Sequence, residues 1–277
     1  MTGNVRRALL GLLMVPTLGL AVACTSSSGD HRSSDQTTSA APTIPATGLP
    51  TDIPTLPATA PDSAAALAAF MQSGLSLTGY EHLRFRTGLA GTSLTGQGDA
   101  VLVNGDVSGL KADAVVSKVG DVQLLSVGGT GFAALPKPTA PGKRYTKIGG
   151  SVAGAQMDRV AIALQATQLL AAPATYRTLV AAAENFRRLS DDKIGATPVF
   201  HFRGTVPVQK IPATDRVNLA LTALGVTSLD LQVWVDGRGR PLKVAAPAPD
   251  GRISDVTFTD INKPVSIAAP AASQVDQ

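Results

Sequence analysis

Hydrophobic and polar residues alternate in short runs from residue 83 onward, and turn residues separate these runs. In the clearest run, residues 229–236, every second residue is Leu or Val. Asn104-Gly105 and the Asp-Gly-Arg-Gly sequence at 236–239 are typical of hairpin turns. Because strand side chains alternate between two faces, the pattern predicts an antiparallel meander. We expect strands at residues 83–87, 99–103, 110–118, 122–127, 186–191, 198–206, 229–236, 240–246, 256–258 and 265–267.

Three other stretches have apolar residues at helical spacing. They are residues 63–75, a helix pair that begins after Ser151 and is interrupted at Pro173, and residues 213–224. A helix buries its apolar side on another apolar surface, and the sheet offers the only large one. We therefore expect these helices to pack on the sheet. The expected boundary residues are Asp62 or Ser63 and Thr214 at helix starts, and Gly225 at the end of the last helix.

The N-terminal residues 1–23 have the pattern of a signal peptide. Two arginines precede an apolar stretch of about 16 residues, which is shorter than the roughly 20 that span a bilayer. Small Ala23 before Cys24 resembles the bacterial lipobox, although Ala21 stands where Leu is favoured. We expect export, removal of residues 1–23, and a lipid on Cys24 that anchors the protein outside the cytoplasmic membrane. The alternative is an ordinary secretory signal followed by an incidental cysteine.

Residues 24–62 are rich in Ser, Thr and Pro. Their few large apolar residues stand singly between prolines and cannot bury enough surface to offset the entropy of ordering. We therefore expect a disordered tether with polyproline II character. As a flexible coil it would span about 35 Å, and as stiff polyproline up to about 115 Å. His31 lies in this tether, where we expect it to be solvated rather than bound to a metal.

Composition and charge limit the possible partners. The chain has 277 residues, of which 44% are hydrophobic, and a formal charge of +4. These values are typical of a globular protein. A nucleic-acid-binding protein has a concentrated basic face, and a net charge this small gives no sign of one. We therefore expect no nucleic-acid partner. Cys24 is the only cysteine, so no internal disulfide can form and the apolar core must stabilise the fold.

The motifs of common catalytic sites are missing from the sequence. It contains no GxSxG, P-loop, HExxH or paired-cysteine zinc motif. Apart from the tether histidine, the imidazoles are His82 and His201, each near an arginine on or beside a predicted strand. We therefore predict no enzyme activity, no cofactor and no metal. The weakest alternative is a cell-wall hydrolase, in which one of these histidines would meet a carboxylate and a nucleophile.

Two short stretches contain residues that also occur in phosphate sites. Residues 128–131 are Gly-Gly-Thr-Gly, but no Lys-Ser/Thr and no helix pattern follow, so we predict a turn. Lys143, Arg144 and Lys147 surround Tyr145. We expect this basic cluster to be a solvated strand edge, and contact with an anionic headgroup is the alternative.

Three segments resemble a known family. They are Arg-Gly-Thr-Val-Pro at 203–207, Leu-Gln-Val-Trp-Val-Asp at 231–236, and residues 256–265, which end in Lys-Pro-Val. Together with the lipobox and the tether, they resemble the mycobacterial LppX/LprG lipoproteins over residues 63–270. None of these segments is a catalytic motif.

The resemblance implies an α+β fold, in which a strongly curved antiparallel half-barrel carries helices against its concave face. This fold is similar also to that of the LolA/LolB carriers. The resemblance further implies an apolar cavity between sheet and helices that accepts the acyl chains of a lipid or lipoglycan. It also implies a part in moving lipids or lipoglycans through the cell envelope. We expect a monomer and a transport partner there.

We therefore predict a lipid-binding domain at residues 63–270, followed by a frayed tail at 271–277. The domain would carry a lipid or an acylated glycolipid through the envelope. The alternative is a non-catalytic scaffold or protein-binding module that uses the same fold with a filled core. The candidate cavity residues are Phe70, Met71, Leu75, Val101, Val103, Leu124, Val160, Leu164, Leu231 and Val233.

Overall fold

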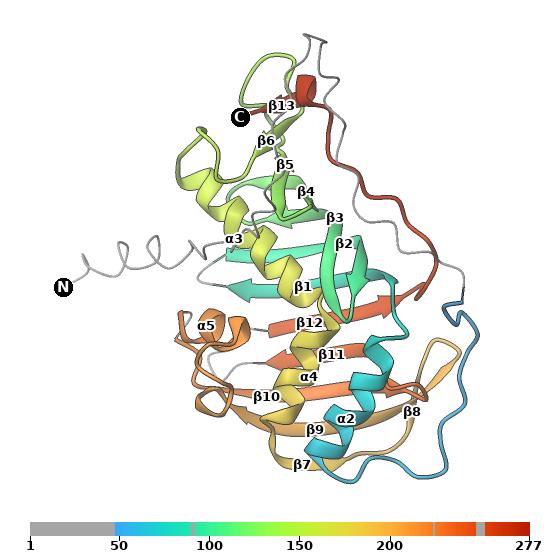
Figure 1. The fold of residues 1–277 in the computed structure, drawn as a ribbon. Helices are drawn as coiled ribbons and strands as arrows, with labels where there is room; N and C mark the ends of the chain where they lie inside the picture. The colour runs from blue at the N-terminus through green and yellow to red at the C-terminus, as the bar shows by residue number, and fades with distance from the viewer. Residues whose placement is uncertain (1–47, 90–91, 224, 248–252) are drawn as a thin grey trace, which may run out of the picture. The chain divides into compact units, whose positions relative to one another are not determined.

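The computed structural model describes residues 48–277, apart from 90–91, 224 and 248–252. The described residues form one large sheet and α-helices that cover it (Figure 1). The strands are β1 (Tyr80–Leu89), β2 (Thr92–Val103), β3 (Asp106–Val116), β4 (Gly120–Val127), β5 (Thr130–Ala134), β6 (Tyr145–Lys147), β7 (Glu184–Arg188), β8 (Asp192–Ile194), β9 (Thr197–Pro207), β10 (Ser228–Asp236), β11 (Pro241–Pro247), β12 (Ile253–Thr259) and β13 (Val275–Asp276).

The strand order is β13-β6-β5-β4-β3-β2-β1-β12-β11-β10-β9-β7, and β8 pairs with β9 beside this path. One meander contains β1 to β6, and a second contains β7 to β12. Antiparallel pairing of β1 with β12 joins them, with Leu83 opposite Phe258. The structure therefore confirms the predicted antiparallel meander and the α+β class, as one open, curved sheet (Figure 1).

The α-helices are α2 (Ala64–Leu75), α3 (Ala155–Leu170), α4 (Pro173–Ala181) and α5 (Arg216–Ala223). Short 3-10 helices are η1 (Val208–Lys210) and η2 (Ala272–Gln274). Figure 1 shows α2, α3 and α4 across one face of the sheet, as the sequence predicted. We call this the inner face, and the opposite one the outer face.

The predicted helix boundaries are confirmed in part. Ser63 caps α2, because its Oγ accepts a hydrogen bond from the Ala66 backbone N–H at 3.2 Å. The predicted interruption of the helix pair at Pro173 is confirmed, because α3 ends at Leu170 and Pro173 opens α4, where its missing N–H costs nothing. The residue that caps α5 is Asp215 and not Thr214, because the Asp215 carboxylate accepts a hydrogen bond from the Val217 backbone N–H at 2.8 Å.

Strand alternation assigns side chains to the two faces as predicted. On β9, Phe200 and Phe202 are buried in the main apolar cluster, while Arg203 lies on the outer face and is exposed. The predicted turn at 128–131 is also confirmed, because Gly128 and Gly129 have positive φ angles between β4 and β5.

The C-terminal residues correct two predictions. No strand forms at 265–267. Residues 271–277 are not frayed, because β13 pairs in parallel with β6 and places Val275 opposite Tyr145. Val275 is buried in an apolar cluster, which explains why this end stays in contact with the sheet. The strand edge beside the basic cluster is therefore paired with β13, while Arg144 stays exposed and Lys143 Nζ donates to the Ser273 carbonyl at 3.0 Å.

The last part of the predicted tether also contacts the folded domain. Arg238 forms an ion pair with Asp52, at 2.7 Å. The Pro50 carbonyl accepts hydrogen bonds from Asn262 at 2.8 Å and from Arg240 at 3.3 Å. We call residues 50–56 the strap. Since each of these contacts joins the strap to residues far along the chain, the folded domain extends N-terminal of the predicted start at residue 63.

A buried ion pair holds the β10–β11 hairpin that receives the strap. The Asp236 and Arg240 side chains are 0% and 5% exposed, and a guanidinium N–H donates to the carboxylate at 2.7 Å. The same carboxylate accepts from the backbone N–H of Arg238 and Arg240. Gly239, at φ +84°, lets α2 approach, since a Cβ there would lie 2.2 Å from the Phe70 carbonyl oxygen.

Replacing Asp236 by Ala is expected to lower the free energy of unfolding by about 3–5 kcal/mol, because it leaves Arg240 charged and buried without its partner. Asp230→Ala is the matched control, since it removes the partner of the half-exposed Arg203 and should cost less than about 1 kcal/mol. Urea denaturation of the three proteins measures the difference. Equal losses for the two variants would contradict the buried role of Asp236.

Candidate functional site

One apolar interior fills the space between the inner face and the helices. Inner-face residues from both meanders, such as Leu83 and Phe258, form a single buried cluster with α2, α3 and α4. The cluster also contains many small side chains, three of which lie on α3 or directly after it. The buried alanines of this cluster are Ala68, Ala100, Ala112, Ala114, Ala133, Ala163, Ala166, Ala171 and Ala246.

Glu81 is an acidic side chain on this inner face. It is only 1% exposed, and its Oε1 has no hydrogen-bond partner. Glu81 lies on β1, where it shares a face with Leu83 and Phe85. Its partner on the neighbouring strand β2 is Ala100. Burial in these apolar surroundings raises the pKa of Glu81 well above its ordinary value of 4.5. The interior therefore favours the protonated, uncharged carboxyl group.

Helix α4 lies next to this acid. The Tyr176 ring is edge-on to Phe258, with centroids 6.0 Å apart, and its hydroxyl donates to the Leu170 carbonyl at 2.7 Å. Burial and then the nearby Glu81 carboxyl raise the pKa of Tyr176 well above 10.0. Tyr176 thus belongs to the interior and lies within electrostatic range of Glu81.

A polar pocket opens where α4 begins. Its volume is about 400 Å³, and it lies between α4, the start of α5 and Asp106 at the β2–β3 turn. Thr175 Oγ1 and Arg177 Nε are buried atoms without a hydrogen-bond partner, and both residues line this pocket. We call it the α4 pocket. Arg216 and Asp106 form an ion pair across its rim.

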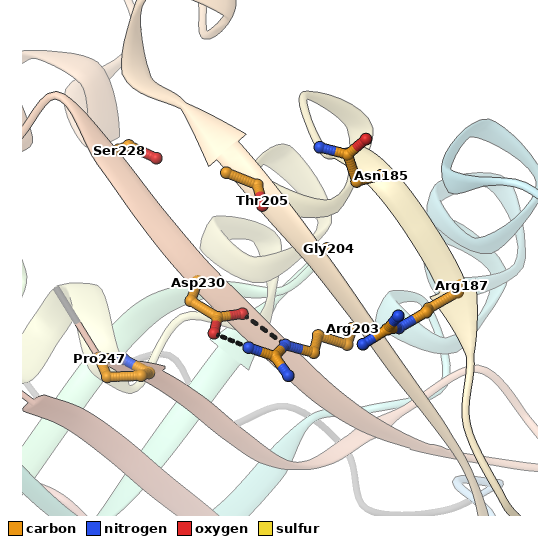
Figure 2. A pocket seen from close by; sticks show the side chains of 8 residues that line it. All are labelled: Asn185, Arg187, Arg203, Gly204, Thr205, Ser228, Asp230 and Pro247. Carbon is orange, nitrogen blue, oxygen red and sulfur yellow. Dashed lines mark hydrogen bonds and ion pairs between the residues drawn. The ribbon is translucent and has the colours of Figure 1, made fainter. Parts of the chain in front are cut away.

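A second polar pocket, of about 550 Å³, lies over β7, β9 and β10 (Figure 2). Figure 2 shows the Arg203 guanidinium joined to the Asp230 carboxylate by two contacts, with Arg187 beside them. Because Arg203 and Asp230 belong to the outer face, this pocket is separated from the apolar interior by the sheet. We call it the outer pocket.

The structure brings most of the predicted cavity residues together in the interior. Val101 and Val103 differ, since Val101 is buried in a separate cluster and Val103 is 46% exposed. Leu75 is buried at the end of α2, and Phe70 packs against the main cluster. None of the ten residues lines either pocket. The six that belong to the main cluster are Met71, Leu124, Val160, Leu164, Leu231 and Val233.

The two histidines of the folded domain have different surroundings. His82 Nδ1 lies 3.0 Å from Asp99 Oδ1. His201 stacks on Trp234 at 4.0 Å, and burial lowers the pKa of His201 below 6.5. Within the residues that the structure describes, neither imidazole hydrogen-bonds to a hydroxyl or thiol group, which the hydrolase alternative would require.

Some predicted features lie outside the described residues, namely Cys24, His31 and the signal peptide. In residues 48–277, with the gaps given above, no helix has the length and apolar character needed to cross a bilayer. The same residues contain no cluster of three or more His, Cys, Asp or Glu side chains suited to a metal ion.

Comparison with solved structures identifies the fold of this chain. No protein-family model and no curated protein matches the chain. Among solved structures, LprF from Mycobacterium bovis is similar with a TM-score of 0.50 and 15% identity, over 77% of this chain and 100% of LprF. The chain has the fold of LprF. LppX from Mycobacterium tuberculosis is similar with a TM-score of 0.45 and 15% identity, over 73% of this chain and 98% of LppX.

The similarity to LprF confirms, at the level of the fold, the family resemblance indicated by the sequence. Sequence reasoning missed Glu81 and the α4 pocket. A signal for Glu81 was present, because it has the same strand parity as Leu83 and Phe85 and so belongs to the apolar face. No comparable signal existed for Thr175 and Arg177, which the start of α4 brings to the pocket.

Replacing Glu81 by Gln is expected to change how stability depends on pH. The folded protein holds the Glu81 proton more tightly than the unfolded chain, so the free energy of unfolding falls as pH rises above 4.5 through the folded-state pKa. Gln stays uncharged and removes this contribution. Urea denaturation between about pH 4 and pH 8 measures the slope, with half-exposed Glu184→Gln as the control. An unchanged slope in Glu81→Gln would contradict the raised pKa.

Proposed function

We propose that this protein is an exported lipoprotein, anchored through Cys24, that binds an acyl lipid between its inner sheet face and helices and carries it within the cell envelope. The observation that supports this most is the continuous apolar interior, in a fold shared with the lipoprotein LprF. The apolar N-terminal segment and Cys24 add the means of export and anchoring.

The energetics of burial favour an acyl ligand. Shielding a sixteen-carbon chain from water contributes on the order of 12 kcal/mol before the costs of binding are subtracted. Such a ligand needs apolar surface and no reactive group. The inner face and the helices supply this surface without a catalytic arrangement.

The helices must move to admit the chain, because interior side chains such as Leu124 and Val160 are 0% exposed. Two features of α3 and α4 suit such a movement. Neither helix has a side-chain hydrogen bond at its N-cap, Gly154 or Ala172. Their contacts include alanines, which bury little apolar area per residue. A chain that replaces these contacts therefore offers more apolar burial than it displaces.

A second function is favoured by the same filled interior. With its core occupied by its own side chains, the domain would serve as an envelope scaffold that contacts another protein. The α4 pocket and the outer pocket are lined mostly by polar residues, which suits surface contact better than storage of an acyl chain. The two functions differ in whether the folded chain takes up lipid.

Lipid uptake is the direct test. After incubation with phosphatidylcholine vesicles, native mass spectrometry of the full chain should show one bound lipid. Ala166→Leu should reduce the occupied fraction at least about tenfold, because a larger side chain competes for the space between α3 and the sheet. Gln165→Leu, on the exposed side of α3, is the matched control. A lipid-free mass for the wild-type chain, in spite of a folded circular dichroism spectrum, would favour the scaffold.

The anchor is tested separately. Cys24→Ser removes the thiol that would receive the lipid, so the protein should move from the membrane fraction to the soluble fraction. Two or three acyl chains bind a membrane far more firmly than surface charge does, since each buried methylene contributes about 0.8 kcal/mol. Fractionation followed by a high-salt wash makes the distinction. A Cys24→Ser protein that still sediments with membranes would contradict lipid anchoring.

A further inference from the structure

Three buried side-chain atoms of the described residues lack any hydrogen-bond partner. They are Glu81 Oε1, Thr175 Oγ1 and Arg177 Nε. Leaving such a group buried and unpaired is unfavourable, and native proteins keep few of them. All three lie on α4 or next to it, because Glu81 is close enough to influence Tyr176, which lies between Thr175 and Arg177 in the sequence. Their grouping requires an explanation.

Helix α4 separates these atoms into two neighbouring environments. Thr175, which is 7% exposed, and Arg177 line the α4 pocket. Tyr176 turns the other way, into the apolar interior, where it meets Phe258 at a ring distance of 6.0 Å. Glu81 lies on the inner face of that interior. A ligand that extends from the pocket into the interior would therefore pass polar groups before it reaches apolar ones.

The chemistry of each group defines what it can bind. The Thr175 hydroxyl can donate and accept a hydrogen bond, and Arg177 Nε can only donate. Because burial favours its protonated form, Glu81 can donate through its O–H and accept through its carbonyl oxygen. Donors predominate in this set. Hydroxyl and ester oxygens are the complementary groups.

Charges around the α4 pocket are balanced. Arg177 and Arg216 line it together with Asp106 and Asp215, which gives equal numbers of guanidinium and carboxylate groups. Arg216 is already paired with Asp106. A phosphate group would meet no excess of positive charge here. The balance favours an uncharged ligand over an anionic one.

We propose that the α4 pocket and Glu81 form a polar subsite that binds the uncharged, oxygen-bearing head of an acyl lipid, while its chain enters the apolar interior beside Tyr176. This subsite rests on the proposed lipid-binding function and adds its chemical selectivity. Thr175 and Arg177 bind hydroxyl oxygens of the head in the pocket. Glu81 binds the oxygen at which head and chain meet.

Three probes with the same sixteen-carbon chain test the subsite. They are 1-palmitoylglycerol, with an uncharged head, palmitoyl lysophosphatidic acid, with an anionic head, and hexadecane, with no head. Binding of each probe to the full chain is measured by native mass spectrometry over a concentration series. The wild-type protein should bind 1-palmitoylglycerol at least about tenfold more tightly than either other probe, the effect of one or two net hydrogen bonds.

Variants then assign the selectivity to residues. Glu81→Leu, Thr175→Val and Arg177→Met should each weaken 1-palmitoylglycerol binding about tenfold and leave hexadecane binding unchanged. Glu81→Gln keeps a donor and an acceptor and should keep the selectivity. Thr205→Val and Arg187→Met, in the outer pocket, are the matched controls and should change nothing. Thermal unfolding confirms that each variant folds.

Each result separates the subsite from the broader function. If the wild-type protein binds no probe, the lipid-binding function fails and the subsite with it. If it binds all probes equally, or if the three variants keep the wild-type preference, lipid binding stands and the subsite is overturned. Tighter binding of lysophosphatidic acid would overturn the preference for an uncharged head.

Discussion

Contact between the inner sheet face and the helices is the interaction on which the rest of the structure depends. The sheet joins two meanders through β1 and β12, and one apolar cluster spans both of them. Because the chain cannot form an internal disulfide, burial of this face supplies the main stabilisation. The same surface would have to receive an acyl chain. Stability and the proposed function therefore draw on one set of contacts.

If the domain binds lipid as proposed, the polar groups near α4 limit which lipids the interior accepts. An apolar interior alone would accept any hydrocarbon with little discrimination, since the hydrophobic effect is not directional. Unpaired donors such as Arg177 Nε favour ligands that satisfy them, and a site with unpaired polar groups rejects analogues that leave them unpaired. In the proposed function, selectivity among lipids would arise from the polar groups at the start of α4, and affinity for the acyl chain would arise from the apolar face of the sheet.

Alternation of residue types was sufficient to predict the antiparallel class and the two faces of β9. It failed for β2, where Ala100, Val101, Leu102 and Val103 are all apolar, so the pattern could not show that Ala100 and Leu102 face inward. Pairing of β13 with β6 depends on residues far apart in the sequence, and no local signal marks it. The strap was missed because its contacts depend on Arg238 and Arg240, which composition does not reveal.

The strap also has a mechanical consequence. A pull on the chain from its N-terminal side would first load the Asp52–Arg238 ion pair and the hydrogen bonds to the Pro50 carbonyl. These contacts pass the load to the β10–β11 hairpin, which the buried Asp236–Arg240 pair holds together. Helix α2 follows the strap in the sequence and would be shielded from this tension. If the chain is anchored through Cys24 as proposed, tension from the anchor would be borne by the hairpin before it reached the helices over the sheet.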